Sequence, residues 1–175
     1  MKKNVKFLTH AAVLAALYVV LTYAQNILWP GSTSMAIQFR LSEALCIFAL
    51  FTPAAIPGLT LGCLLFNLSN AQALPLDWLV GTLATLGAVS CMWFLRQAKL
   101  GKFPLMSLLM PALWNAFLVG WELTKFLADR FTWPVFWINA LYVAIGEAAV
   151  LLVLGTALYF ALTARSLDRK LFAGD

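Results

Sequence analysis

The sequence predicts an all-α integral membrane protein, a single domain over residues 1–175 that crosses the membrane six times with both termini in the cytoplasm. Two observations lead to this fold class. Apolar residues make up 63% of the chain and charged residues only 11%, whereas soluble domains have about 25% charged residues. Mean hydropathy is +0.88, and apolar runs long enough to cross a bilayer recur along the chain. The net charge of +5 therefore reports membrane orientation and not nucleic-acid binding.

The first predicted span covers residues 7–24 and follows three lysines. Its length suffices to cross a membrane, and no small-x-small cleavage site ends it, so we expect a retained helix and not a signal peptide. Small residues four apart allow another helix to approach closely. The run contains two overlapping pairs of this kind, formed by Ala11, Ala12, Ala15 and Ala16.

The next two predicted spans cover residues 40–52 and 55–69. Pro53 lies between them, and Pro57 lies near the start of the second. Each proline removes a backbone donor and disfavours a helical residue before it, which argues for two spans instead of one. Basic residues support this choice. Six spans leave nine of the 12 basic residues in the cytoplasm, whereas five spans leave five there, against the positive-inside tendency.

Three further spans are predicted at residues 77–95, 104–127 and 135–163. Asp77 opens the first of them as a plausible N-cap. In the six-span topology, polar residues gather toward the outer side, and the inner half contains mostly hydroxyl groups. A pore or a self-sufficient carrier needs polar groups through to both faces. The pattern instead predicts a protein that captures a ligand from outside and needs a partner to release it inward.

The candidate ligand-binding residues include charged and amide side chains that an apolar protein would otherwise exclude. They are Gln38, Arg40, Glu43, Asn67, Asp77, Asn115, Glu122, Asn139 and Glu147, with Trp114 and Trp121 as aromatic candidates. On the fifth span, the two tryptophans, Asn115, Glu122 and Lys125 share an arc roughly 120° wide. Arg40 and Glu43 are three residues apart, so they form either a structural pair or a ligand-facing one.

Other chemistry has little support in the sequence. Cys46, Cys63 and Cys91 lie in apolar runs without metal-ligand partners, and His10 lies near the start of the first span. We find no nucleotide-binding loop, metal motif or nucleophile elbow. The sequence therefore predicts no catalytic residues, no metal, no cofactor and no enzyme activity.

The chain resembles the QueT family nearly end to end. Three segments carry the resemblance: residues 37–45 (Ile-Gln-Phe-Arg-Leu-Ser-Glu-Ala-Leu), Asp77-x-x-x-Gly81 with the following Thr-Leu-Ala-Thr-Leu, and Gly146-Glu147-Ala148. That family belongs to the substrate-binding (S) components of energy-coupling factor (ECF) transporters. The resemblance implies a six-helix S-component bundle in a bacterial plasma membrane. It also implies uptake of queuosine precursors, the 7-deazaguanine bases with a cyano (preQ0) or aminomethyl (preQ1) group.

The resemblance further implies a partner ECF module of two ATPase subunits and a transmembrane coupling subunit. The coupling subunit would bind an alanine-xxx-alanine surface, here Ala11/Ala15 or Ala12/Ala16. For the ligand, a carboxylate can accept hydrogen bonds from the ring NH and the exocyclic amine of a guanine-like edge together. Glu147 is the first candidate for this role because it lies deep in its span, ahead of Glu122, Glu43 and Asp77.

The remaining candidates suit the rest of a flat base. Trp114 or Trp121 would stack on it, amides such as Asn115, Asn67 and Gln38 would serve its carbonyl and ring nitrogens, and Arg40 would bind the carbonyl or hold Glu43. The uncharged loop at residues 29–36 is a candidate lid. Two alternatives stay open: an S component for a different vitamin or nucleobase, and a structural membrane protein whose polar residues only tie helices together.

Overall fold

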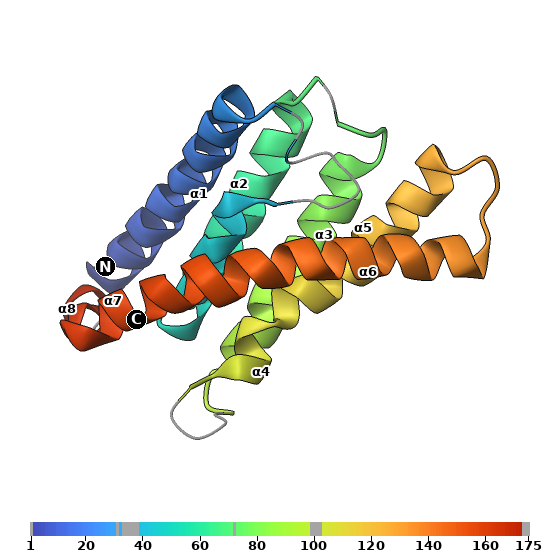
Figure 1. Cartoon of the computed structure of the whole chain (residues 1–175). Coiled ribbons are helices and arrows are strands. Elements are labelled where there is room, and N and C mark those ends of the chain that lie inside the picture. The colour runs from blue at the N-terminus through green and yellow to red at the C-terminus, as the bar shows by residue number, and fades with distance from the viewer. Residues whose placement is uncertain (1, 31, 33–38, 72, 99–102, 173–175) are drawn as a thin grey trace.

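The computed structural model describes residues 2–30, 32, 39–71, 73–98 and 103–172, and its regular elements over these ranges are helices (Figure 1). In chain order they are α1 (Lys2–Leu28), η1 (Leu41–Leu50), α2 (Ala55–Ser69), α3 (Asp77–Phe94), α4 (Leu105–Leu108), α5 (Met110–Leu127), α6 (Trp133–Val150), η2 (Leu151–Gly155), α7 (Thr156–Ala164) and α8 (Leu167–Phe172). The all-helical class expected from the sequence is confirmed over these residues.

Four helical stretches are long and apolar enough to cross a membrane: Lys3–Leu28, Asp77–Phe94, Leu105–Leu127 and Trp133–Ala164. Two shorter apolar helices, η1 and α2, lie where the second and third spans were predicted. A ten-residue 3-10 helix is about 20 Å long and a 15-residue α-helix about 22 Å, both shorter than a hydrocarbon core of about 30 Å. The six-span count and the cytoplasmic termini therefore stay predictions.

Prolines and a half-buried aspartate lie at the boundaries of several helices. Pro53 lies between η1 and α2, and Pro57 falls in the first turn of α2, where a missing N–H costs little. Asp77 is the first residue of α3, and its Oδ2 accepts a hydrogen bond from the backbone N of Leu74 at 2.8 Å. The N-cap prediction for Asp77 is therefore wrong, because its side chain fastens the preceding loop instead of the helix.

The helices pack in a chain-wise series in which α1 contacts α2, α2 contacts α3, and α3 contacts α5. In Figure 1, α6 runs across the other helices at a steep angle, and it packs mainly on α5. The short helix η1 contacts α1, α2, α3, α6 and η2. This central position carries the charged residues at the start of η1 into the interior of the bundle.

The contact between α1 and α2 depends on two glycines. A Cβ on Gly58 would lie 2.6 Å from the carbonyl oxygen of Ala11, and one on Gly62 would lie 2.9 Å from that of Ala15. Ala11 and Ala15 are accordingly buried. Ala12 and Ala16, which form the second alanine pair, are exposed. The two overlapping alanine pairs thus have different surroundings, which the sequence alone left open.

Gly58→Ala is expected to destabilise the protein by about 1–3 kcal/mol, because its methyl group would meet backbone atoms that cannot move without shifting α1. Thermal unfolding of the detergent-purified protein measures this effect. Gly155→Ala is the matched control, since the nearest atom to its new methyl group would be the end of the Leu108 side chain at 3.3 Å. Equal stability of the Gly58 and Gly155 variants would contradict the close α1–α2 contact.

The last described helix, α8, folds back on the N-terminal part of α1. The Phe172 ring of α8 packs edge-on against His10 of α1, with ring centroids 5.2 Å apart, and also contacts Phe48 and Phe51. His10 thus takes part in a packed aromatic contact. The three cysteines are free thiols, with Cys46 and Cys63 buried.

Candidate functional site

A buried glutamine on α1 holds the chain that leads into η1. The Gln25 side chain accepts a hydrogen bond from the Leu41 backbone N at 2.8 Å and donates to the Ser32 hydroxyl at 2.9 Å and to the Phe39 carbonyl. These bonds fix the backbone on both sides of Arg40, which is buried at 6% exposure. Sequence reasoning missed Gln25, although an amide near the end of an apolar span was a signal for it.

Glu43 is the next buried charge, and the protein itself binds both of its oxygens. The Tyr18 hydroxyl donates to Oε1 at 2.7 Å, and the Cys46 thiol contacts Oε2 at 3.3 Å. One turn further along α1, the Thr22 hydroxyl bonds to Ser42 at 2.8 Å. Glu43 is thus anchored to α1. Tyr18 was also missed from the sequence, because a single tyrosine in an apolar span is compatible with any face.

Two other glutamates are buried with less support. Glu122 on α5 is 0% exposed and Glu147 on α6 is 1% exposed. Within the part of the chain that the structure describes, neither oxygen of Glu122 has a hydrogen-bond partner, and Oε2 of Glu147 also has none. Leaving a buried carboxylate unsatisfied costs several kcal/mol unless a proton, a cation or a ligand compensates it. These two side chains mark the candidate binding site.

Arg40 connects the buried carboxylates. It interacts electrostatically with Asp77 and Glu147 and also with Glu122. Glu147 in turn lies within electrostatic reach of Glu43. Asp77, Glu122 and Glu147 thus lie within electrostatic reach of one guanidinium, although they come from α3, α5 and α6, and Glu43 of η1 lies near Glu147. The chain has seven acidic residues in all, so more than half of them lie in this cluster.

The predicted amides have different surroundings. Asn67 is buried on α2 and donates to the Asp77 backbone oxygen at 2.9 Å. A Cβ on Gly81 would lie 2.6 Å from the Asn67 amide nitrogen, so the glycine leaves room for it. Asn115 is buried on α5, two turns from Glu122. Asn139 is only half-buried, and its amide donates to the Thr124 hydroxyl at 3.0 Å, which ties α6 to α5.

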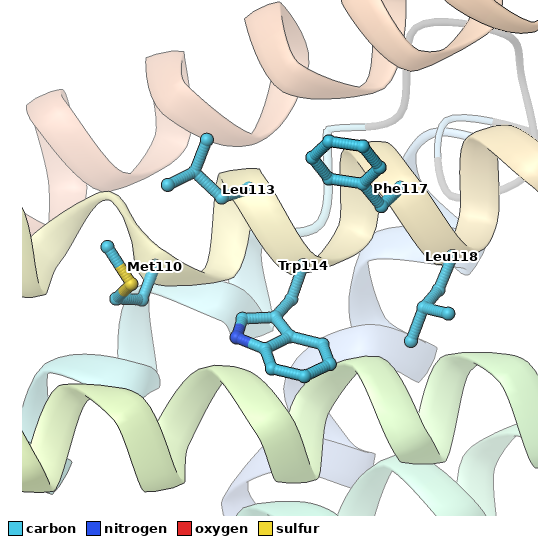
Figure 2. A pocket seen from close by; sticks show the side chains of 5 residues that line it. All are labelled: Met110, Leu113, Trp114, Phe117 and Leu118. Carbon is cyan, nitrogen blue, oxygen red and sulfur yellow. The ribbon is translucent and has the colours of Figure 1, made fainter.

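Both predicted stacking residues are partly exposed on α5. Trp114 is 36% exposed and Trp121 is 39% exposed. Trp114 lines an apolar groove of about 260 Å³ together with Met110, Leu113, Phe117 and Leu118, whose side chains are drawn in Figure 2. A Cβ on Gly87 would come within 2.6 Å of its indole ring, so the ring packs closely on α3.

The two indoles are thus more exposed than Asn115 and Glu122, with which they share an arc of α5. Successive residues of a helix differ in direction by about 100°, so the interior boundary can pass between neighbours. It passes between Trp114 and Asn115 and again between Trp121 and Glu122. Lys125 is exposed as well. Gln38, like residues 31 and 33–36 of the predicted lid, lies outside the described residues.

Comparison with known protein families identifies the chain. A family model described as QueT transporter matches residues 8–164, which is most of the sequence. Neither the curated proteins nor the solved structures gave a match. The resemblance seen in the three sequence motifs is therefore confirmed by a match over almost the whole length. The chain belongs to the QueT transporter family and is a transmembrane substrate-uptake (S) component rather than an enzyme.

Proposed function

We propose that this chain is the capture subunit of an ECF importer in a bacterial plasma membrane and binds 7-deazaguanine queuosine precursors from the extracellular side. Beyond family membership, the observation that carries the proposal is the buried Glu147 oxygen without a partner among the described residues. A guanine-like base presents a ring NH and an exocyclic amine side by side. A buried carboxylate accepts both bonds, and such charge-assisted pairs are strong and directional.

The groups around Glu147 suit the rest of such a base. The Arg40 guanidinium interacts with Glu147 and has donors for the ring carbonyl, which lies beside the ring NH in guanine-like bases. The buried amide of Asn115 adds a further donor and acceptor in the interior. Glu43 has a different role in this proposal. Tyr18 and Cys46 already occupy its oxygens, so it positions the start of η1.

The exposed alanine pair supports the expected partner. Ala11 and Ala15 are buried against α2, whereas Ala12 and Ala16 are exposed on α1. A small-residue surface lets a second helix approach its backbone closely. We therefore assign the contact with the transmembrane coupling subunit to Ala12 and Ala16. Two partner ATPase subunits would supply the energy for release.

Replacing Ala12 and Ala16 together by leucine is expected to abolish co-purification with the coupling subunit and uptake of labelled base into cells. Binding of the base to the isolated chain should stay unchanged, because both side chains are exposed on α1 whereas the candidate site residues are buried. Leu83→Phe, which adds bulk at an exposed position of α3, is the control. Normal assembly and uptake in the double variant would rule out this surface as the contact.

Competition for a labelled deazaguanine tests the cargo. Unlabelled cyano- and aminomethyl-deazaguanine should displace the label, guanine should compete more weakly, and biotin and riboflavin should have no effect. Displacement by biotin or riboflavin would assign the protein to another cargo. A folded protein that binds none of these compounds would favour the alternative of a structural membrane protein.

A further inference from the structure

Two apolar grooves adjoin each other on the exposed face of α5. The first, of about 260 Å³, runs along α5 itself, and the second, of about 350 Å³, lies between α5 and α6. Leu113 and Phe117 line both grooves, and both side chains are exposed. These two residues therefore form a ridge, the α5 ridge, that separates the two grooves.

The walls of the two grooves come from different helices. On one side of the α5 ridge, the wall consists of three further side chains of α5: Met110, Trp114 and Leu118. Figure 2 shows these three side chains projecting from the opposite side of the helix to the two ridge residues. On the other side of the ridge, α6 contributes Trp137 and Leu141, and three alanines complete the lining: Ala116, Ala140 and Ala144. The linings of both grooves are therefore suited to apolar chains.

The length of the first groove matches one leaflet of a membrane. The chain is a transmembrane protein, and α5 belongs to a stretch, Leu105–Leu127, that is long and apolar enough to cross a bilayer. Met110 and Leu118, at the two ends of the groove, are eight residues apart, which is about 12 Å along an α-helix. Half of a hydrocarbon core of about 30 Å is about 15 Å. The groove is therefore long enough to align most of one acyl chain.

A cation lies at one end of the same face of α5. At about 100° per residue, Lys125 points within about 20° of Trp114, and it lies in the last turn of the helix. Lys125 is exposed, as is Trp121 one turn before it. Tryptophan and lysine near the end of a span are typical of the membrane interface, where the lysine ammonium reaches the lipid headgroups. Leu118, the nearer end of the first groove, lies about 10 Å from Lys125 along α5.

We propose that one anionic diacyl phospholipid straddles the α5 ridge, with one acyl chain in each groove and its phosphate beside Lys125. Two chains joined at one headgroup match two grooves that one ridge separates. Lys125 supplies the positive charge, because the exposed Asp129 and Arg130 that follow α5 have opposite formal charges. The inference concerns the lipid-facing surface and does not depend on the cargo.

The width of the first groove excludes a second helix as its occupant. Trp114 and Phe117, on its two sides, are three residues apart on one helix, and the Cβ atoms of such neighbours are about 5–6 Å apart. A helix with its side chains is about 10 Å wide. An acyl chain is narrow enough to lie between the two side chains. The exposed Phe117 also stands between the two grooves, which a lipid with two separate chains accommodates.

The test is native mass spectrometry of the full-length purified protein, which counts bound lipids during titration with three probes. They are dioleoyl phosphatidylglycerol, dioleoyl phosphatidylcholine and the single-chain oleoyl lysophosphatidylglycerol. Wild type should bind one phosphatidylglycerol per chain, about fivefold more tightly than phosphatidylcholine, as expected for one lysine at an anionic lipid. The single-chain lipid should bind at least tenfold more weakly, because it fills only one groove.

Two variants separate the headgroup contact from the grooves. Lys125→Gln should abolish the preference for phosphatidylglycerol over phosphatidylcholine. Ala144→Leu places a larger side chain in the second groove, so it should weaken the diacyl lipid about tenfold and change the single-chain lipid by less than about twofold. Lys170→Gln, at an exposed lysine of α8, is the matched control and should behave as wild type.

Three results would overturn the inference. They are equal binding of the two diacyl lipids by wild type, an unchanged lipid preference in Lys125→Gln, and equal binding of the diacyl and single-chain phosphatidylglycerols. A wild-type dimer without bound lipid would also overturn it, because a second copy would then cover this face.

Discussion

Arg40→Ala is expected to destabilise the unliganded protein by about 3–5 kcal/mol, because it leaves buried carboxylates without their cation. Arg40 is 6% exposed and interacts with Asp77, Glu122 and Glu147. Burying one charge without its partner is far more costly than losing a surface ion pair. An effect of this size consumes a large part of the stability of a typical domain. We therefore expect low yields and a strongly reduced unfolding temperature.

The matched control is Arg96→Ala. Arg96 stacks on Trp93, with its guanidinium carbon 3.6 Å from the ring centroid, and donates to the Trp93 carbonyl at 2.7 Å. It lies at the end of α3, away from the carboxylate cluster. A partly exposed cation–π contact contributes about 0.5–1 kcal/mol. Arg40→Ala and Arg96→Ala variants of equal stability would mean that Arg40 does not hold the cluster together.

Glu147→Gln should weaken binding of the deazaguanine bases by at least tenfold. A hydrogen bond to a charged group is worth about 1.5–3 kcal/mol, and 1.4 kcal/mol corresponds to a factor of ten in the dissociation constant. The amide that replaces the carboxylate keeps one acceptor but turns the other into a donor, so it cannot accept both N–H groups of the base. Titration calorimetry on the purified protein measures the change.

Glu43→Gln separates ligand binding from folding. Glu43 accepts from Tyr18 and Cys46, so its replacement should lower the unfolding temperature and change the dissociation constant little. Glu147→Gln should do the reverse, because it removes a buried carboxylate with an oxygen that has no partner among the described residues. An unchanged dissociation constant for Glu147→Gln would remove this residue from the binding site.

The sequence predicted where the helices lie, because apolar runs and prolines mark their positions directly. The break at Pro53 and the helix that begins at Asp77 are examples. It also singled out Arg40, Glu122 and Glu147 as candidate site residues, because a charge in an apolar protein needs a partner. Each polar residue in an apolar sequence is by itself a candidate site residue. Periodicity is not needed to locate them.

The faces of the helices could not be predicted in the same way. In a membrane helix the lipid-facing side is as apolar as the packed side, so hydrophobic periodicity does not show which side is buried. The neighbours Trp114 and Asn115 fall on opposite sides of this boundary, as do Ala11 and Ala12. For the same reason, no sequence pattern shows that Tyr18 and Gln25 lie on the buried face of α1. Their roles depend on which face of α1 meets η1.

The most direct test of a capture protein for queuosine precursors is its thermal stability with and without the two deazaguanines, with guanine and riboflavin as controls. A ligand that binds only the folded state must stabilise it, by about 2.7 kcal/mol at a concentration of 100 times its dissociation constant. We expect a rise in unfolding temperature with at least one of the two deazaguanines and none with riboflavin. A cooperative transition that neither deazaguanine shifts would contradict the proposed cargo.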